Sequence, residues 1–253
     1  MSELKALIFD VDGTLADNEQ DGHRVAFNRA FEEAGFDWHW DEEIYEQLLT
    51  VFGGKERIHY YLRDFLEGFT PPADTDEFVR DLHAQKTRHY VALLQSGAIP
   101  LRPGVERLLR EAHASAVRLA IASTTTLENA TTLLSRTLGE DSIEWFDVIA
   151  CGDIVANKKP APDIYLYALE KLGLSAAECL VVEDTESGLA SARAAGLRCV
   201  ITVNHCTHNQ DFSGATIVLN HLGEPDQPFS VLQGDGGNSN HADMALLRRL
   251  HSD

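Results

Sequence analysis

Near its start the chain reads Leu4-Lys5-Ala6-Leu7-Ile8-Phe9-Asp10-Val11-Asp12-Gly13-Thr14-Leu15. The apolar first half of this segment predicts a buried β-strand, and two aspartates follow it at once. Alternate side chains of an extended chain share a face, so Asp10 and Asp12 would lie on one side if the strand continued. Gly13 permits a sharp bend, and a simple Asp-Gly turn is the alternative explanation. Two carboxylates at one point would require a cation.

The chain is strongly acidic. It has 40 Asp and Glu residues against 21 Lys and Arg residues, for a formal charge of −19. This charge would repel nucleic acid and anionic membranes over most of the surface, so we exclude both as main partners. We expect a monomer whose partner is a small molecule. An anionic substrate would need a local cluster of cations.

The first residues lead directly into the first predicted strand and do not resemble a signal peptide. No apolar run in the sequence reaches the roughly 18 residues that a membrane span needs. We therefore expect a cytoplasmic protein. The cysteines are scattered without a Cys-x-x-Cys pair, and we predict that they are reduced and mostly in the core. They are Cys151, Cys179, Cys199 and Cys206.

Hydrophobic periodicity divides the chain into an α/β core and a helical insertion. Within residues 17–96, helical spacing occurs in Arg24–Ala34, Asp41–Thr50, Lys55–Glu67 and Thr75–Leu94. Beyond Pro103 the predicted helices are 105–114, 127–137, 162–172 and 186–195, and they alternate with the strands Arg118–Ala122, Asp147–Ala150, Cys179–Val182 and Arg198–Thr202. Such alternation predicts a Rossmann-like parallel sheet covered on both faces.

We accordingly expect residues 1–16 and 97–222 to form the α/β core, with residues 17–96 inserted as an α-helical domain. Residues 223–253 form a C-terminal tail in this division. Residues 234–240 of the tail have a flexible composition, and Ala242–Leu250 is a predicted short helix. The tail could dock on the core or take part in association.

Polar residues follow three of the predicted strands. In an open α/β sheet, ligands bind at the carboxyl ends of the strands, so these residues should meet at one edge. Three such strand ends, together with one lysine pair, are hard to obtain by chance. The groups are Asp10 with Asp12, Ser123 with Thr124, Glu183 with Asp184, and Lys158-Lys159-Pro160.

In order and spacing, these motifs resemble the four motifs of the haloacid dehalogenase superfamily. They read Asp10-Val11-Asp12-Gly13-Thr14, then Ser123 or Thr124, then Lys159-Pro160-Ala161-Pro162-Asp163, then Glu183-Asp184 with Gly188 downstream. The resemblance covers about residues 4–220. It implies a HAD-like core with a helical cap, which is the inserted domain here, placed over the active site.

Three segments of the insertion are similar to the CbbY-type branch of that superfamily. They are Asp37-Trp38-His39-Trp40-Asp41, Gly53-Gly54-Lys55-Glu56-Arg57, and the segment from His83 to Lys86-Thr87. The branch includes phosphatases that act on xylulose-1,5-bisphosphate, an inhibitor of the carbon-fixing enzyme Rubisco, which links it to the Calvin cycle. Phe52 departs from the branch, whose members tend to have a small hydroxyl residue at this position beside the glycine pair.

Phosphoryl transfer needs a nucleophile, neutralisation of the phosphoryl oxygens and an acid for the leaving oxygen. Asp10 is the predicted nucleophile, since a carboxylate can form an aspartyl-phosphate that water later hydrolyses. Asp12 would give a proton to the leaving oxygen and later take one back. Lys159 would balance charge as a compact cation, with a solvated lysine before a helix as the alternative. Ser123 would donate its hydroxyl to a phosphoryl oxygen.

We expect Mg²⁺ as the cofactor, because it is a hard cation that prefers oxygen ligands. Its predicted ligands are Asp10, the backbone carbonyl of Asp12, and Asp184, with Glu183 assisting or orienting. Thr14 is expected to steady the loop through its hydroxyl.

Substrate choice is expected to lie in the cap. Gly53 and Gly54 would let backbone N–H groups approach an anion, and Arg57 could grip phosphate with two bonds, although an ordinary helix N-terminus would look the same. For His83 and Lys86, a solvated stripe on one helix face remains the alternative to substrate binding. For Thr124 and Thr125, the alternative is capping of the next helix. The predicted substrate-binding residues are Glu19, Gly53, Gly54, Lys55, Arg57, His83, Lys86, Thr124 and Thr125.

The favoured function is a Mg²⁺-dependent phosphatase that converts xylulose-1,5-bisphosphate to xylulose 5-phosphate. The resemblance implies that Asp12 separates phosphatases and phosphomutases from dehalogenases. A sugar phosphomutase of the β-phosphoglucomutase type, or a phosphatase for another small phosphorylated metabolite, therefore stays open. A non-enzymatic binding protein is the third hypothesis, and the full set of acids, hydroxyl and lysine argues against it.

Overall fold

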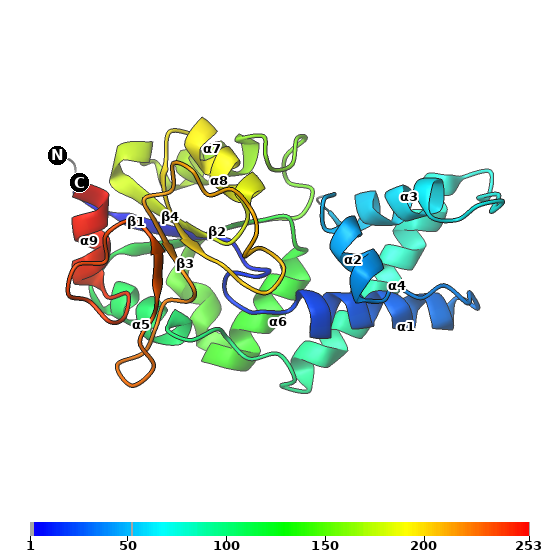
Figure 1. Cartoon of the computed structure of the whole chain (residues 1–253), viewed down its shortest axis with the longest axis horizontal. Coiled ribbons are helices and arrows are strands. Elements are labelled where there is room, and N and C mark those ends of the chain that lie inside the picture. Colours follow the sequence, from blue (N-terminus) through cyan, green and yellow to red (C-terminus); the bar gives the residue numbers. More distant parts are fainter. Residues whose placement is uncertain (1–2, 52, 253) are drawn as a thin grey trace. The chain divides into compact units, whose positions relative to one another are not determined.

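The computed structural model describes residues 3–51 and 53–252, so Phe52 lies outside the described residues. By its internal contacts the chain forms two compact units (Figure 1). The first, here called the core unit, contains the residues up to Asp17 and from Pro100 onward. The second, here called the cap unit, is Asn18–Ile99.

The core unit is built on one sheet, which in the described residues has the strand order β3-β2-β1-β4-β5-β6-β7. The first six strands along the chain pair in parallel, and β7 pairs antiparallel with β6. Because β1 lies between β2 and β4, all four of its residues are buried, which explains its continuous apolar run. The strands are β1 Ala6–Phe9, β2 Arg118–Ser123, β3 Phe146–Cys151, β4 Cys179–Glu183, β5 Arg198–Thr202, β6 Ile217–Leu219 and β7 Val231–Gln233.

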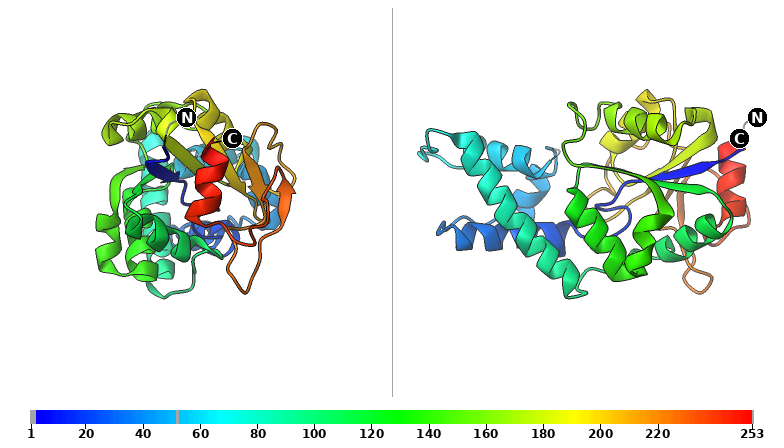
Figure 2. Two further views of the ribbon diagram at one scale, coloured as in Figure 1. Left: turned by 90° about the vertical axis from the view of Figure 1, so that its left-hand side faces the viewer. Right: turned by 180° about the vertical axis from the view of Figure 1, so that it is seen from behind.

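Helices cover both faces of this sheet (Figures 1 and 2). Ala6 and Ile8 belong to the buried cluster that includes residues of α7 and α8, whereas α5 and α6 lie on the other face. The α/β fold predicted from the sequence is confirmed. The helices are α5 Val105–Ala114, α6 Leu127–Leu138, α7 Asp163–Leu172, α8 Glu186–Ala194 and α9 Met244–Ser252, with short 3-10 turns at Glu140–Trp145 and Ala176–Glu178.

The C-terminal tail belongs to the core unit and is not a part of its own. Strand β7 extends the sheet, and the N–H of Met244 donates to Glu111 Oε1 on α5 at 3.0 Å. The apolar residues Leu246, Leu247 and Leu250 of α9 are buried. Of the two alternatives left open by the sequence, docking on the core is the one observed. Hydrophobic burial of α9 is the physical reason.

The cap unit is helical, with a large aromatic cluster. Trp40 is fully buried, with its ring centroid 4.4 Å from that of Phe27 and 5.0 Å from that of Phe31. The Asn28 side chain holds the Trp40 backbone through two hydrogen bonds of 2.8 Å. The elements of this unit are a π-helical turn at Glu19–Arg24, α1 Val25–Glu33, α2 Glu42–Leu48, α3 Gly54–Asp64 and α4 Thr75–Gln95.

The four cysteines are free thiols. Cys151, Cys179 and Cys199 are buried free thiols, as predicted, and Cys206 is half-buried. Across the described ranges, no helix combines the length and the apolar character needed to cross a bilayer.

Candidate active site

The ends of three adjacent strands bring the predicted core residues together. Asp10 directly follows β1, and its N–H donates to Val182 O at 3.0 Å, which continues the pairing with β4. Ser123 is the last residue of β2 and Glu183 the last of β4. Since β1 pairs in parallel with both strands, these side chains share one edge of the sheet.

Three buried carboxylates form a cluster at this edge. One oxygen each of Asp10, Glu183 and Asp184 lies within 4.8 Å of the others. Burial raises the pKa of Asp10 to about 7, with Lys159 opposing and Glu183 adding to the shift. Burial, and then repulsion by Glu183 and Asp10, raises the pKa of Asp184 well above its ordinary value. Three carboxylates face a single ammonium group here, so their negative charge is not fully balanced. Buried carboxylate oxygens in this arrangement form a set of ligands that fits a hard divalent cation.

The ammonium of Lys159 is buried within this cluster. Its Nζ donates to Asp10 Oδ1 at 2.6 Å, to Glu183 Oε1 at 2.5 Å and to Ala122 O at 2.9 Å, so all three N–H groups have acceptors. Burial lowers the pKa of Lys159, but the two carboxylates outweigh burial and raise the pKa above its usual value. Lys159 is therefore a permanent cation. Lys158, in contrast, is half-buried and forms an ion pair with the exposed Asp153 at 2.9 Å.

Glu183 accepts hydrogen bonds on both carboxylate oxygens. Oε1 accepts from Lys159 and from the Tyr165 hydroxyl at 2.7 Å, and Oε2 accepts from the N–H of Asp184 at 3.1 Å. Oxygens already engaged in this way orient other groups better than they bind a metal directly. A Cβ on Gly188 would collide with this carboxylate, which explains the glycine downstream of the acidic pair.

Asp184 is held by two side chains. The Thr14 hydroxyl donates to Oδ1 at 3.2 Å, and the Asn204 amide donates to Oδ2 at 2.7 Å. The same amide nitrogen of Asn204 also donates to Gly13 O at 3.3 Å. Asn204 thus links the loop after β1 to the acidic residue after β4.

The sequence reasoning missed two residues that support this edge, Asn204 and Arg102. The buried Arg102 guanidinium donates to Gly13 O, to Thr202 O at 2.9 Å, to Val203 O at 2.5 Å and to Asn220 O at 2.8 Å. Burial lowers the pKa of Arg102. Asn204 comes shortly after β5, so the expectation that site residues follow the carboxyl ends of strands could have identified it. For Arg102 the sequence carries no such signal.

The other polar residues predicted for this site lie at the ends of β1 and β2. Asp12 is half-buried, and its charge contributes to the raised pKa of Asp10. The N–H of Thr125 donates to Ser123 Oγ at 3.3 Å, and Thr125 Oγ1 accepts from the Asn129 side chain at 3.2 Å. Thr124 is half-buried. Thr125 therefore supports the start of α6 as well as lying near the strand end.

In the cap unit, Glu19 and Arg57 form an ion pair. Arg57 Nη1 lies 3.4 Å from Glu19 Oε2, and the Tyr45 hydroxyl donates to the same oxygen at 2.5 Å. Arg57 Nε also donates to Val51 O at 2.9 Å. The sequence predicted both residues for substrate binding, and the structure adds that Arg57 and Tyr45 fix the position of the Glu19 carboxylate.

The remaining predicted cap residues lie at the start of α3 and along α4. Gly53 precedes α3, the half-buried Lys55 is in its first turn, and the His83 ring lies beside Gly54. Lys86 is buried, with Nζ 2.6 Å from His23 Nδ1. Its ammonium lies 4.9 Å from the Tyr90 ring centroid. A solvated position for Lys86 was the alternative, and its burial rules that out.

The fold, the acidic cluster and the buried lysine together define a hydrolase of phosphate esters. The model of the haloacid dehalogenase-like hydrolases matches residues 4–196, and the chain belongs to this family as a phosphatase enzyme. Within the family it belongs to the CbbY-like branch. It is 46% identical over 248 residues to the plasmid-encoded protein CbbY of Cupriavidus necator, covering 98% of this chain and 97% of that one.

Solved structures support the same family assignment. The crystal structure of CbbY from Rhodobacter sphaeroides in complex with phosphate has a TM-score of 0.81 and 44% identity, and covers 86% of this chain and 94% of that one. A mutant of that protein has been solved with xylulose-1,5-bisphosphate, with the same similarity and coverage. A phosphorylated carbohydrates phosphatase of Thermotoga maritima is 31% identical over 202 residues, covering 80% of this chain and 86% of that one.

Proposed function

We propose that this protein is a Mg²⁺-dependent phosphatase that hydrolyses xylulose-1,5-bisphosphate to xylulose 5-phosphate and inorganic phosphate. The observation that carries the reaction type is the buried Asp10 carboxylate with the Lys159 ammonium 2.6 Å from it. The observation that supports the substrate is the 44% identity to a CbbY whose mutant binds this bisphosphate.

In the proposed first step, a carboxylate oxygen of Asp10 attacks the phosphorus. A bond forms from this oxygen to phosphorus, the bond to the sugar oxygen breaks, and Asp12 gives its proton to the leaving oxygen. In the second step, Asp12 takes a proton from water while that water attacks the aspartyl-phosphate. Inorganic phosphate leaves and Asp10 is restored.

Lys159 and Ser123 assist both steps. Lys159 favours the ionised form of the Asp10 carboxylate and orients it, and its charge opposes the negative charge of the phosphoryl group. The hydroxyl of Ser123 donates to a phosphoryl oxygen. Asp10, Asp184 and the carbonyl of Asp12 would hold the Mg²⁺, with Glu183 orienting its neighbours. Bound Mg²⁺ neutralises the charge of the phosphoryl oxygens and lowers the repulsion between phosphate and carboxylates.

Selection of the substrate is proposed for the cap unit. Glu19, fixed by Tyr45 and Arg57, would bind sugar hydroxyls, since a carboxylate accepts hydrogen bonds. Gly53, Gly54 and Lys55 would bind the second phosphate at the start of α3, with His83 beside them. The buried Lys86 would influence substrate binding from within the cap unit, through its contact with His23. Thr124 and Thr125, in the core unit, remain predicted substrate contacts.

A panel of phosphate esters tests the substrate. Phosphate release would be measured for xylulose-1,5-bisphosphate, other ketose bisphosphates, hexose monophosphates and a generic phosphomonoester. We expect kcat/KM to be highest for xylulose-1,5-bisphosphate. Arg57→Ala should lower this preference, while Arg63→Ala, an exposed arginine on the same helix, should retain it. Equal rates across the panel would refute the substrate assignment and leave the phosphatase class standing.

A further inference from the structure

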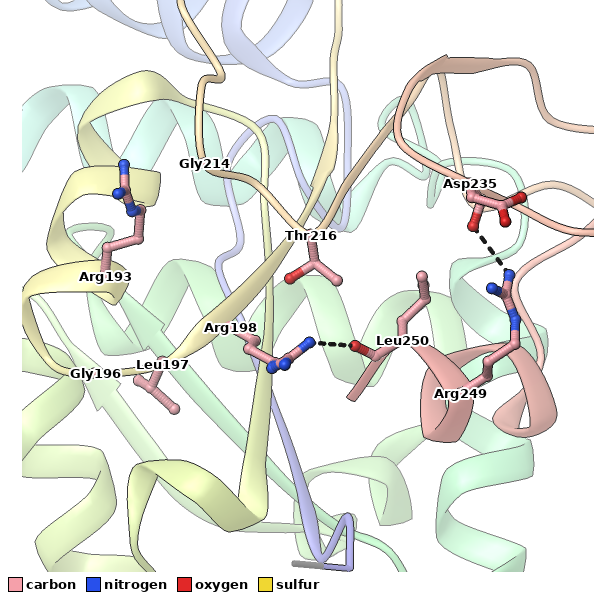
Figure 3. Close-up of a pocket in the computed structure, with 9 residues that line it drawn as sticks. All are labelled: Arg193, Gly196, Leu197, Arg198, Gly214, Thr216, Asp235, Arg249 and Leu250. Carbon is pink, nitrogen blue, oxygen red and sulfur yellow. Dashed lines mark hydrogen bonds between the residues drawn. The ribbon is translucent and has the colours of Figure 1, made fainter. Parts of the chain in front are cut away.

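A pocket lies in the core unit, away from the cluster of buried carboxylates (Figure 3). Its volume is about 560 Å³, within the range of pockets that hold small metabolites. Arg198 begins β5 and Thr216 directly precedes β6, so the pocket is at the amino ends of these parallel strands. The acidic cluster follows the carboxyl ends of β1 and β4. The two sites therefore lie at opposite edges of the sheet.

Three arginines line this pocket, in a chain whose formal charge is −19. Arg193 comes from the last turn of α8, Arg198 from β5 and Arg249 from α9. Figure 3 shows Arg193 on one side, Arg249 on the other, and Arg198 between them. Two consecutive elements, α8 and β5, and the more distant C-terminal helix α9 thus bring positive charge to one cavity.

The guanidinium groups are held by neutral backbone acceptors. Arg193 donates to Ser213 O at 3.0 Å, Arg198 to Leu250 O at 3.0 Å and Arg249 to Asp235 O at 2.9 Å. Within residues 3–51 and 53–252, neither Arg193 nor Arg198 forms a salt bridge, although the chain has 40 acidic residues. A guanidinium has five N–H donors, so one carbonyl bond leaves Arg193 and Arg198 with donors for a ligand.

The backbone at Gly214 fits closely against Arg193. A Cβ at this position would lie 2.5 Å from atoms of the guanidinium, and the backbone φ is +92°. A side chain at residue 214 would displace the guanidinium. Together with the bond to Ser213 O, this close approach holds Arg193 in place before any ligand arrives, which reduces the entropy cost of binding.

We propose that this pocket binds a small phosphorylated metabolite through Arg193 and Arg198, with Arg249 at its border. Planar guanidinium groups recognise phosphate with paired hydrogen bonds, and the volume exceeds what a free phosphate ion fills. The Thr216 hydroxyl lines the same pocket. Asp235 also lines the pocket, and its carboxylate accepts a bond from the N–H of Gly237 at 2.7 Å, so a negative charge lies at the border of the pocket.

The test uses the full chain with metal removed by a chelator, because without a bound divalent metal the acidic cluster repels phosphate. Ribose 5-phosphate and inorganic phosphate are each titrated by calorimetry. We expect one site, with ribose 5-phosphate bound more tightly than inorganic phosphate. Absence of binding of both probes would overturn the proposal. Equal affinity for the two probes would overturn the assignment to a metabolite.

Arg193→Gln is the main variant, because it removes only an exposed bond to Ser213 O, whereas Arg198→Gln removes a part-buried bond to Leu250 O on α9. Arg193→Gln should weaken the binding of ribose 5-phosphate at least about tenfold. Arg248→Gln is the matched control, since Arg248 is an exposed arginine of α9 outside the pocket and its loss changes the net charge equally. The control should bind as the wild type does. Equal weakening in both variants would mean non-specific attraction and would overturn the site.

Asp235→Asn should change the affinity for ribose 5-phosphate in the direction opposite to Arg193→Gln. It removes the carboxylate that opposes the anion, so ribose 5-phosphate should bind more tightly. Unchanged or weaker binding would contradict the placement of the ligand beside Asp235. Because substrate turnover plays no part in these titrations, their failure would leave the proposed phosphatase reaction untouched.

Discussion

The Lys159 ammonium lies 2.6 Å from Asp10 Oδ1, and this contact joins the third predicted motif to the first. Removing the charge leaves Asp10 and Glu183 buried without their shared cation. We predict that Lys159→Met lowers kcat by about 10²–10³ and destabilises the fold by about 3–5 kcal/mol. Steady-state phosphate release and urea unfolding would measure the two effects.

The neighbouring lysine provides the control for this variant. Lys158 forms its ion pair with Asp153, whose side chain is exposed. Lys158→Met should therefore change kcat less than about twofold and stability by less than about 1 kcal/mol. A Lys159 variant as active as the Lys158 variant would contradict the role given to Lys159.

Asn204 donates to Asp184 and should set the affinity for the cation. We predict that Asn204→Ala raises the Mg²⁺ concentration needed for half-maximal activity by about 10–100-fold, because outer hydrogen bonds hold a ligand's orientation. At saturating Mg²⁺ the rate should recover. Asn157→Ala, which removes an exposed amide bonded to Asp163 at 2.8 Å, should leave this concentration unchanged. A lower rate that saturating Mg²⁺ does not restore would assign Asn204 another role.

Arg102 donates to four backbone carbonyls of the core unit, and we predict that its main role is in stability. Arg102→Met leaves these buried acceptors without a donor, so the free energy of unfolding should fall by about 3 kcal/mol or more. Chemical unfolding measures this value. Arg110→Met, which removes an exposed i,i+4 pair with Glu106, should cost less than about 0.5 kcal/mol. Similar losses in the two variants would contradict the assignment.

The stability of the metal-free protein should depend on pH. Burial raises the pKa of Asp10 to about 7, whereas an unfolded aspartate titrates near 4. Between these values the folded state keeps a proton that the unfolded chain has lost. The stability due to Asp10 is thus fully present below about pH 4 and falls as the pH rises to about 7.

Thermal unfolding in a chelator across this pH range would reveal the effect as a decreasing Tm. Added Mg²⁺ should stabilise the protein more at pH 7 than at pH 5, because it binds the ionised carboxylates. Asp10→Asn, which cannot ionise, should show a smaller decrease. A metal-free Tm that rises over the same range would be inconsistent with the raised pKa.

Much of the fold and the centre of the site could be predicted because both depend on local patterns. The predicted helix 105–114 and strand Arg198–Thr202 match α5 and β5 at both ends. Asp10, Ser123 and Glu183 were predicted to meet because each lies at a strand end of a parallel sheet. Periodicity and topology were enough for these features.

Features that depend on contacts between distant segments could not be predicted. Strands β6 and β7 have three residues each, too few for a periodic pattern, and all three residues of β7 are exposed. Arg102 reads as an ordinary surface arginine, since its acceptors come from residues 13, 202, 203 and 220. The glycine-rich composition of residues 234–240 gave no indication that α9 docks on the core.

The most direct test of the central claim is a phosphorus NMR time course of the Mg²⁺-loaded protein with xylulose-1,5-bisphosphate. The account predicts that inorganic phosphate and xylulose 5-phosphate appear in equal amounts, and that Asp10→Asn produces neither. Conversion to an isomeric phosphate with little free phosphate would instead indicate a phosphomutase. Release of phosphate by Asp10→Asn at the wild-type rate would contradict Asp10 as the nucleophile.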